Sequence, residues 1–140
     1  ELSGKLRENT FVLRTSIIGL TENYVSDGLL DWFMRQEDGA TISGYTNHLW
    51  NGITTLEWCY LAEKIILGSA PQSSNGIIQV GAGNTISKYE LLVCANEVFG
   101  RSVRVEPIRT ADDVTRVLRP EVKMQNIQDQ LANYWSWMSD

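Results

Sequence analysis

The sequence predicts a single α/β domain over residues 1–140, because stretches typical of strands and of helices alternate along the chain. Two Ser/Thr-x-x-Glu capping boxes each stand before an apolar helical pattern, which indicates where two of the helices begin. Hydrophobic residues make up 43% of the chain and charged residues 21%, the ordinary balance of a domain that can bury a core. We expect about four strands and four to five helices.

The first third of the chain contains a predicted strand, a helix and a second strand. Residues 10–18 are rich in β-branched and aromatic side chains and stop at a glycine, which is typical of a strand buried on both faces. Apolar residues then recur at helical spacing over residues 25–36, and Asp38-Gly39 predicts a turn. Residues 40–46 have the composition of a short strand that leads into a polar loop.

The rest of the chain contains three predicted helices and two further strands. Thr54 and Ser87 are the expected N-caps of the first two helices, and Gly68 and Gly100 stand where these helices should end. The two predicted strands cover residues 76–80 and 102–106, the second closed by a proline, Pro107. The last helix carries one apolar face, formed by Ile127, Leu131, Tyr134, Trp135 and Met138.

Charge and composition argue against several classes of protein. A net charge of -5 argues against a nucleic-acid binder, which needs a basic face. No apolar run approaches the length of about 18 residues that a membrane span requires. Cys59 and Cys94 both fall in helical patterns, so we expect buried, reduced thiols and a cytoplasmic protein, with a Cys59–Cys94 disulfide as the alternative. One histidine and no Cys-x-x-Cys pair give little basis for a metal site.

Two short patterns imitate functional motifs of dehydrogenases. Tyr60 and Lys64 have the spacing at which a lysine lowers the pKa of a phenol, so that the phenol can exchange a proton with a carbonyl oxygen. That spacing is common on helices, and a packed tyrosine beside a solvated lysine also explains it. Gly81-Ala-Gly83 imitates a dinucleotide fingerprint, but Ile86 stands where its third glycine should be. We therefore interpret the first pattern as structural and the second as a turn.

Three longer stretches carry a resemblance to a known family. They are FVLRTSIIG at residues 11–19, GYTNHLWNGITTLE at 44–57 and NTISKYELL at 84–92. Together they resemble the extended short-chain dehydrogenases/reductases that act on nucleotide sugars, nearest to the dTDP-4-dehydrorhamnose reductase-like branch. The resemblance covers nearly the whole chain and implies the C-terminal part of an extended Rossmann-type fold.

The same resemblance implies a set of site residues. Thr15 and Ser16 take the places that line the nicotinamide of NAD(P) and the sugar ring, unless neighbouring backbone satisfies their hydroxyls. Asn47, His48, Trp50 and Asn51 lie in the loop that covers the substrate's nucleotide, although His48 could be a structural hydrogen bonder and Trp50 a core side chain. Arg119 falls where relatives carry an arginine near the nucleotide diphosphate, and Arg116 is the alternative, one helical turn away. No catalytic residue and no metal ligand is implied.

In the family, the glycine-rich phosphate loop and the catalytic Tyr-x-x-x-Lys lie before the stretch that residues 11–19 resemble. We therefore expect the substrate-binding half of an NAD(P)-dependent nucleotide-sugar reductase or epimerase, of the 4-keto-sugar reductase type. Alone, this half should bind no cofactor and have no activity. Its partners would be a nucleotide-diphosphate sugar and either a second copy of the chain or the missing N-terminal half. The alternative is a non-catalytic module that binds a sugar nucleotide or completes a split enzyme.

Overall fold

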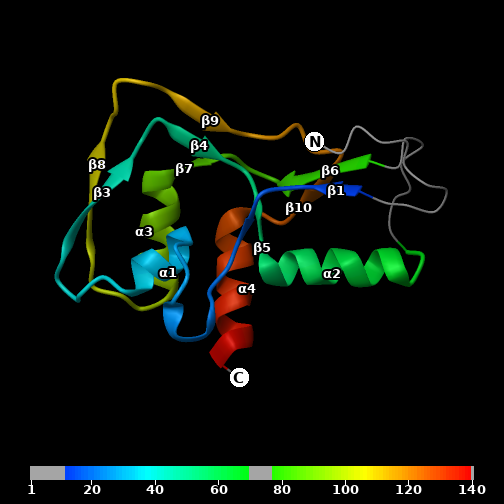
Figure 1. The fold of residues 1–140 in the computed structure, drawn as a ribbon, viewed down its shortest axis with the longest axis horizontal. Coiled ribbons are helices and arrows are strands. Elements are labelled where there is room, and N and C mark those ends of the chain that lie inside the picture. The colour runs from blue at the N-terminus through cyan, green and yellow to red at the C-terminus, as the bar shows by residue number, and fades with distance from the viewer. Residues whose placement is uncertain (1–11, 70–76, 140) are drawn as a thin grey trace.

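The structure is a computed structural model that describes residues 12–69 and 77–139 (Figure 1). Its helices are the short 3-10 helix η1 (Glu22–Tyr24), α1 (Leu29–Met34), α2 (Thr55–Ile66), α3 (Lys88–Val98) and α4 (Ile127–Ser139). Its strands are β1 (Val12–Arg14), β2 (Ile17–Ile18), β3 (Thr41–Tyr45), β4 (His48–Trp50), β5 (Ile53–Thr54), β6 (Ile77–Ala82), β7 (Ile86–Ser87), β8 (Arg104–Ile108), β9 (Val114–Arg116) and β10 (Val122–Met124).

Most strand pairs in the described residues are parallel, which confirms the predicted α/β class. β1, β6 and β10 form one parallel sheet in the order β1-β6-β10, and β3 pairs in parallel with β8. β4 lies between β7, its antiparallel neighbour, and β9, its parallel neighbour. The described part contains ten strands rather than the expected four, because many are only two or three residues long and leave no periodic pattern in the sequence.

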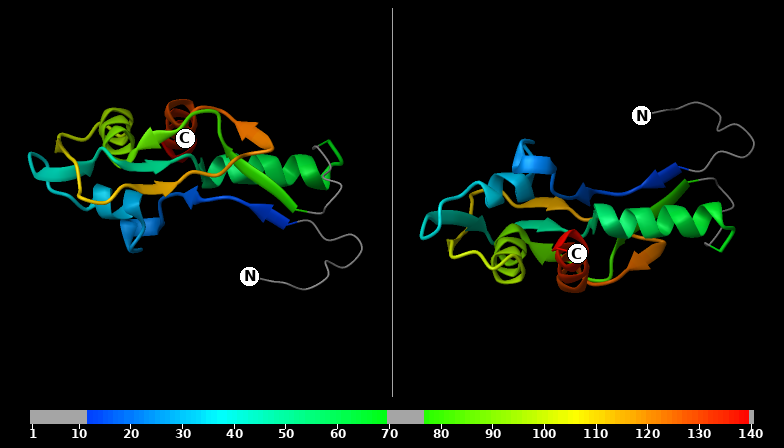
Figure 2. Two further views of the ribbon diagram at one scale, coloured as in Figure 1. Left: turned by 90° about the horizontal axis from the view of Figure 1, so that it is seen from above. Right: turned by 90° about the horizontal axis from the view of Figure 1, so that it is seen from below.

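The helices lie on both sides of the strands. Figure 2 shows α3 and α4 on one side of the middle layer and α1 on the other. The larger core lies among α1, α3 and α4, where Leu30, Phe33, Leu92 and Leu131 are all fully buried. A smaller core under α2 contains Ile53, Leu61, Ile78 and Val80.

Both predicted N-caps are confirmed. The Ser87 side chain accepts from the backbone N–H of Glu90, and the Glu90 carboxylate accepts in return from the backbone N–H of Ser87, which completes the capping box of α3. Thr54 accepts from the N–H of Glu57 in the same way. Its own N–H donates instead to the side chain of buried Gln130, at 2.9 Å, so the second box is only half formed.

Four details differ from the sequence-based expectations. Residues 12–18 form two strands, β1 and β2, that pair with different partners, and residues 10 and 11 lie outside the described part. The expected helix over residues 25–36 contracts to α1, preceded by η1. Pro107 lies inside β8 and does not close it, since edge strands tolerate proline. Cys59 is exposed on α2, so only Cys94 is buried; both cysteines are free.

Candidate functional site

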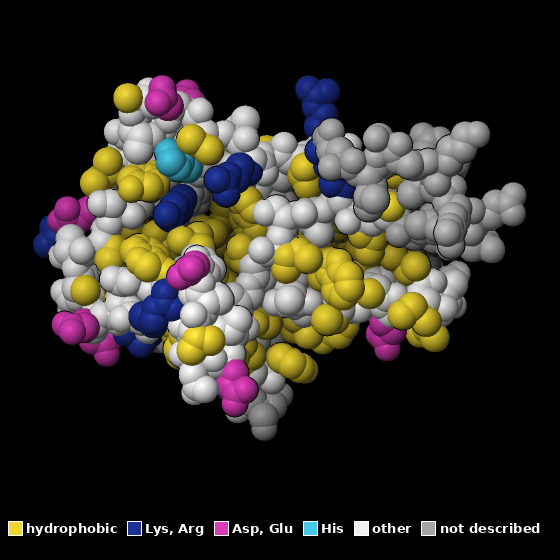
Figure 3. Space-filling model, viewed as in Figure 1, with side chains coloured by type: hydrophobic (Ala, Val, Ile, Leu, Met, Phe, Trp, Pro, Cys, Tyr) yellow, Lys and Arg dark blue, Asp and Glu magenta, His cyan; other side chains and the backbone are white. Residues whose placement is uncertain are grey.

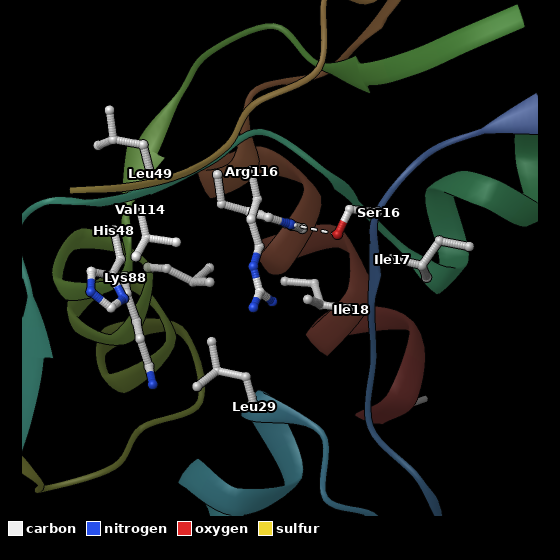
Figure 4. Close-up of a pocket in the computed structure, with 11 residues that line it drawn as sticks. Ser16, Ile17, Ile18, Leu29, His48, Leu49, Lys88, Val114 and Arg116 are labelled. Atoms are coloured by element: carbon white, nitrogen blue, oxygen red, sulfur yellow. Dashed lines mark hydrogen bonds between the residues drawn. The ribbon is translucent and has the colours of Figure 1, made fainter. Parts of the chain in front are cut away.

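A cavity of about 390 Å³ opens between α1, β4 and β9, and we call it the first cavity. Figure 3 shows hydrophobic side chains on this face with basic side chains around them. The apolar lining consists of Ile17, Ile18, Leu29, Leu49, Leu91 and Val114. The polar lining consists of Ser16, His48, Trp50, Lys88 and Arg116, and Figure 4 shows how the cavity residues lie. Its size and mixed lining are typical of sites that bind small molecules.

The parallel pairing of β4 with β9 brings the polar residues together. In this register His48 is opposite Val114, and Trp50 is opposite Arg116. Because residues two apart on a strand point to the same side, the four side chains share one face. The pairing joins segments 66 residues apart in the chain, which is why no local sequence pattern reveals it.

Lys88 and Arg116 are the two cations of the first cavity. Figure 4 shows their side chains extending toward Leu29 from α3 and from β9. The Lys88 ammonium also lies 5.1 Å from the Tyr45 ring and 5.5 Å from the Trp32 ring, a cation–π arrangement. Burial lowers the pKa of Lys88, and the charge of Arg116 lowers it further. Within the described part of the chain, neither cation donates a hydrogen bond or forms an ion pair.

Trp50 and Ser16 hold each other in place at one wall of the first cavity. The indole N–H of Trp50 donates to the Ser16 hydroxyl at 2.8 Å, and the N–H of Ile53 donates to the Ser16 carbonyl at 2.9 Å. A side chain at Gly52 would collide with both the Trp50 ring and the Ser16 carbonyl oxygen, so glycine is required for this packing. Thr15 does not line the first cavity, and its hydroxyl contacts the Ser16 carbonyl at 3.5 Å.

His48 lies at the rim of the first cavity in a fixed position. Its Nε2 is 2.9 Å from the Thr110 hydroxyl, which is hydrogen-bonding distance. Its ring packs at 4.6 Å, centroid to centroid, against Tyr45. His48 therefore lines the cavity while the Thr110 hydroxyl holds one of its ring nitrogens.

The segment expected to be a loop contains strand β4, and the two asparagines that flank this strand are buried, at 5% exposure for Asn47 and 3% for Asn51. Their amides bind the chain itself. Asn47 donates to the Thr110 carbonyl at 3.0 Å and accepts from the Thr110 N–H at 3.0 Å. Asn51 donates to the Leu118 carbonyl at 2.9 Å and accepts from the Leu118 N–H at 2.8 Å. Both side chains thus tie residues 110–118 to β4, and in this way they position Arg116.

Arg119 lines a separate cavity, which we call the second cavity, also of about 390 Å³. Its other lining residues are Asn51, Ala82, Gly83, Asn84, Thr85, Val117, Leu118, Pro120 and Lys123. Of the residues predicted for the site, the structure thus brings Ser16, His48 and Trp50 together at the first cavity, and Asn51 and Arg119 at the second. Arg116 belongs to β9 and not to a helix, so its side chain is directed independently of Arg119.

The sequence-based prediction missed Lys88. It directly follows the N-cap Ser87, so its signal is a cation at the first position of a helix, where acidic residues are the rule. Only the pairing of β4 with both β7 and β9 reveals that this lysine faces the same cavity as Arg116.

The two patterns that imitate dehydrogenase motifs lie outside the first cavity. Tyr60 is 46% exposed on α2 and lines neither cavity. A Cβ at Gly81 would lie 2.9 Å from the Asn51 carbonyl oxygen, and one at Gly83 would lie 2.8 Å from the Asn126 side chain. Both glycines therefore allow close packing of the chain's own atoms, which accounts for glycine at these two positions.

Neither a metal cluster nor a membrane-spanning helix is found in the described residues. They contain no group of three or more His, Cys, Asp or Glu side chains placed to hold a metal ion. No helix among them has both the length and the apolar character needed to cross a membrane.

Comparison with known proteins gives a structural likeness only. No family model matches the sequence, and no curated protein matches it. The fold is similar to that of a dTDP-4-dehydrorhamnose reductase from Bacillus anthracis in complex with NADP, at a TM-score of 0.72 and 15% identity, over 91% of this chain and 48% of that one. A dTDP-4-dehydrorhamnose reductase from Clostridium acetobutylicum matches at a TM-score of 0.68 and 14% identity, over 93% of this chain and 49% of that one.

A UDP-glucose 4-epimerase from Thermotoga maritima with UDP-glucose matches at a TM-score of 0.60 and 15% identity, over 93% of this chain and 47% of that one. The chain thus spans about half the length of each of these enzymes. It has the α/β fold of the corresponding part of NAD(P)-dependent nucleotide-sugar reductases and epimerases.

Proposed function

We propose that the first cavity binds a nucleotide-diphosphate sugar, and that the chain is the substrate-binding portion of an NAD(P)-dependent nucleotide-sugar oxidoreductase of the 4-keto-sugar reductase type. The observation that carries this proposal is the convergence of Lys88 and Arg116 on one apolar cavity. Within the described residues neither cation has an anionic partner, and no acidic side chain lines the cavity. A ligand with two adjacent negative groups matches that arrangement.

The two cations have complementary properties for a diphosphate. The Arg116 guanidinium is planar and can donate two parallel hydrogen bonds to phosphate oxygens. Lys88 is a compact charge, and its partial burial strengthens its interaction with an anion. The Trp50 ring and the aliphatic lining then offer apolar contact to a base or a sugar ring. In this proposal Asn47 and Asn51 support the site by holding the segment that carries Arg116.

For the cofactor, the described residues supply one contributor. Ser16 lines the first cavity, and in this proposal it stands where a nicotinamide would meet the sugar. Thr15 precedes it in the chain but lines neither cavity. Ile86 stands where a dinucleotide fingerprint has its third glycine, so we infer no dinucleotide site at this turn and assign no reaction step to the cofactor. The chain alone is accordingly proposed to bind nucleotide sugar without turning it over.

Isothermal titration calorimetry of the chain with UDP-glucose and dTDP-glucose tests the proposal. Arg116→Gln and Lys88→Gln should each weaken binding by about 1.5–3 kcal/mol, or roughly 10- to 150-fold, the scale of a charge-assisted hydrogen bond. Arg104→Gln is the matched control, because Arg104 is a 75% exposed cation on β8 that lines neither cavity. Equal affinity in all variants would refute the assignment of the first cavity.

The alternative, a non-catalytic module that binds sugar nucleotides, shares this binding site and differs in its assembly. Ile66 is 82% exposed and Leu67 70% exposed at the end of α2, an apolar surface open to association. We propose that the chain pairs with a second copy or with a dinucleotide-binding half. Sedimentation that shows a clean monomer at high concentration would contradict pairing with a second copy.

The two free cysteines support a reducing compartment, so we retain the cytoplasm as the proposed location.

A further inference from the structure

Most polar side chains of the first cavity can only donate hydrogen bonds. The ammonium of Lys88, the guanidinium of Arg116 and the indole of Trp50 have no acceptor atom. His48 differs from them, because one nitrogen of a neutral imidazole donates while the other accepts, and the surroundings decide which does which. We propose that Thr110 holds His48 in the tautomer with its proton on Nε2, and that Nδ1 then accepts a hydrogen bond from a hydroxyl group of a ligand in the first cavity.

The amide of Asn47 fixes the direction of the hydrogen bonds around Thr110. Its oxygen accepts from the backbone N–H of Thr110 at 3.0 Å. Its nitrogen donates to the backbone carbonyls of Thr110 and Asp112, each at 3.0 Å. Because a backbone N–H only donates and a backbone carbonyl only accepts, the two ends of this amide cannot be exchanged. The amide oxygen of Asn47 is therefore also an acceptor where it meets the Thr110 hydroxyl.

The Thr110 hydroxyl has one proton and two neighbours that can only accept it. Its oxygen is 3.1 Å from the amide oxygen of Asn47 and 2.9 Å from the carbonyl oxygen of Asp112. One of these two atoms takes the proton, so the third neighbour, Nε2 of His48 at 2.9 Å, supplies a proton of its own. If the hydroxyl donated to Nε2 instead, both pairs of oxygen atoms would be in contact with no proton between them. In the neutral ring the proton is therefore on Nε2.

Nδ1 of His48 is then an acceptor that has no partner among the described residues. The buried side-chain nitrogen without a partner in this part of the chain is Nε of Arg101, so the unpartnered Nδ1 is open to solvent. His48 lines the first cavity and Thr110 does not, so Nδ1 is the ring nitrogen left for a ligand. The packing of the ring against Tyr45 restrains its rotation. Figure 4 shows this ring beside the Lys88 side chain.

A hydroxyl group is the part of a nucleotide sugar that matches this acceptor. Phosphate oxygens accept hydrogen bonds, so they match Lys88 and Arg116 but not an unprotonated Nδ1. A hydroxyl donates, and a nucleotide sugar carries hydroxyls on its sugar and on its ribose. His48 would thus select ligands by a hydroxyl, while the two cations select them by charge. This contact rests on the function proposed above, whereas the tautomer is a property of the ligand-free chain.

The tautomer can be measured directly, because His48 is the only histidine of the chain. Long-range proton–nitrogen NMR spectra of the ligand-free chain, prepared without a histidine tag and recorded at about pH 8, distinguish a protonated from an unprotonated ring nitrogen. We expect Nε2 to be protonated and Nδ1 to be unprotonated. Thr110→Val should give a mixture of both tautomers, and Thr110→Ser, which keeps the hydroxyl, should keep the single one. A proton on Nδ1 in the unaltered chain would overturn the proposal.

The ligand contact is tested by titration with UDP-glucose. At saturation the Nδ1 signal should shift while this nitrogen stays unprotonated. His48→Phe keeps a ring against Tyr45 but has no acceptor, so it should weaken UDP-glucose binding roughly three- to tenfold, the scale of one neutral hydrogen bond. His48→Asn offers an amide oxygen in place of Nδ1 and should recover part of this loss. An equal loss with UDP would assign the hydroxyl to the ribose, and a loss with UDP-glucose alone would assign it to the glucose.

The ligand contact is overturned by three results. Protonation of Nδ1 at saturation would mean that the ring donates to a phosphate. An unchanged Nδ1 signal, or equal affinity of His48→Phe and the unaltered chain, would mean that no hydroxyl meets this nitrogen. If Arg116→Gln and Lys88→Gln both leave the affinity for UDP-glucose unchanged, the proposed function fails and the contact at His48 fails with it, whereas the tautomer of the ligand-free chain is unaffected.

Discussion

Replacing Asp31 with asparagine should lower the free energy of unfolding, because it weakens the bonds that hold the loop before α1 beside the first cavity. Asp31 lies in α1, is fully buried, and accepts four hydrogen bonds, one from the backbone N–H and one from the hydroxyl of each of Thr21 and Ser26. These bonds fasten the loop before α1, and α1 carries Leu29 into the cavity. The carboxylate also stands in the first turn of α1, where a negative charge is favoured.

The magnitude follows from the acidity of this side chain. Burial alone would raise the pKa of Asp31, but the hydrogen bonds from Ser26 and Thr21 outweigh burial and lower it from 3.8 to about 2. This lowering of the Asp31 pKa in the folded chain corresponds to about 2 kcal/mol of folding stability. Because the folded-state pKa is depressed, this contribution is fully present well above pH 3.8 and is lost as the pH falls through about 2.

Urea unfolding at a series of pH values measures this effect. Asp31→Asn should lower the free energy of unfolding by about 2 kcal/mol at pH 7, and the gap to the unaltered chain should close between pH 5 and pH 2. Asp27→Asn, an exposed carboxylate of the same loop, is the control and should change stability by less than about 0.5 kcal/mol. A constant gap at all pH values, or an equal loss in the control, would refute the reasoning.

Further substitutions test the packing around the site. Ser87→Ala removes the N-cap of α3 and should cost about 1 kcal/mol in thermal unfolding. Gln130→Leu leaves the buried N–H of Thr54 unpaired and removes the bond to the Gln125 carbonyl, so it should cost about 1–3 kcal/mol; a neutral result would contradict the observed bonds. Gly52→Ala should displace Trp50 and weaken nucleotide-sugar binding roughly tenfold in calorimetry, an estimate that corresponds to about 1.4 kcal/mol. Tyr60→Phe should leave that affinity unchanged, and reductase turnover by the purified chain that Tyr60→Phe abolished would contradict our structural interpretation of this tyrosine.

Local chemistry explains what the sequence revealed. The helices α2 and α3 were predictable because Thr54 and Ser87 cap them with bonds that span only three residues. The glycines that end them have positive φ angles, +69° at Gly68 and +63° at Gly100, which favour glycine and mark a helix end. The strand β3 was predictable from its composition. These features are all encoded within a few neighbouring residues.

The composition of the site depends on distant pairing and was harder to predict. Asn47 and Asn51 look like free amides in the sequence, but their partners lie more than 60 residues away. Arg116 and Lys88 meet only because β4 pairs with both β9 and β7. No local pattern specifies such a register, so the sequence could name residues 47–51 and offer Arg116 as the alternative to Arg119, but it could not name Lys88.

The most direct test of the central claim is a crystal structure of the chain with UDP-glucose or dTDP-glucose bound. The account predicts density for the ligand in the first cavity, with its diphosphate within hydrogen-bonding distance of Arg116 and Lys88 and its base or sugar against Trp50. Ligand density elsewhere, or a first cavity that stays empty at ligand concentrations that saturate binding in solution, would contradict it.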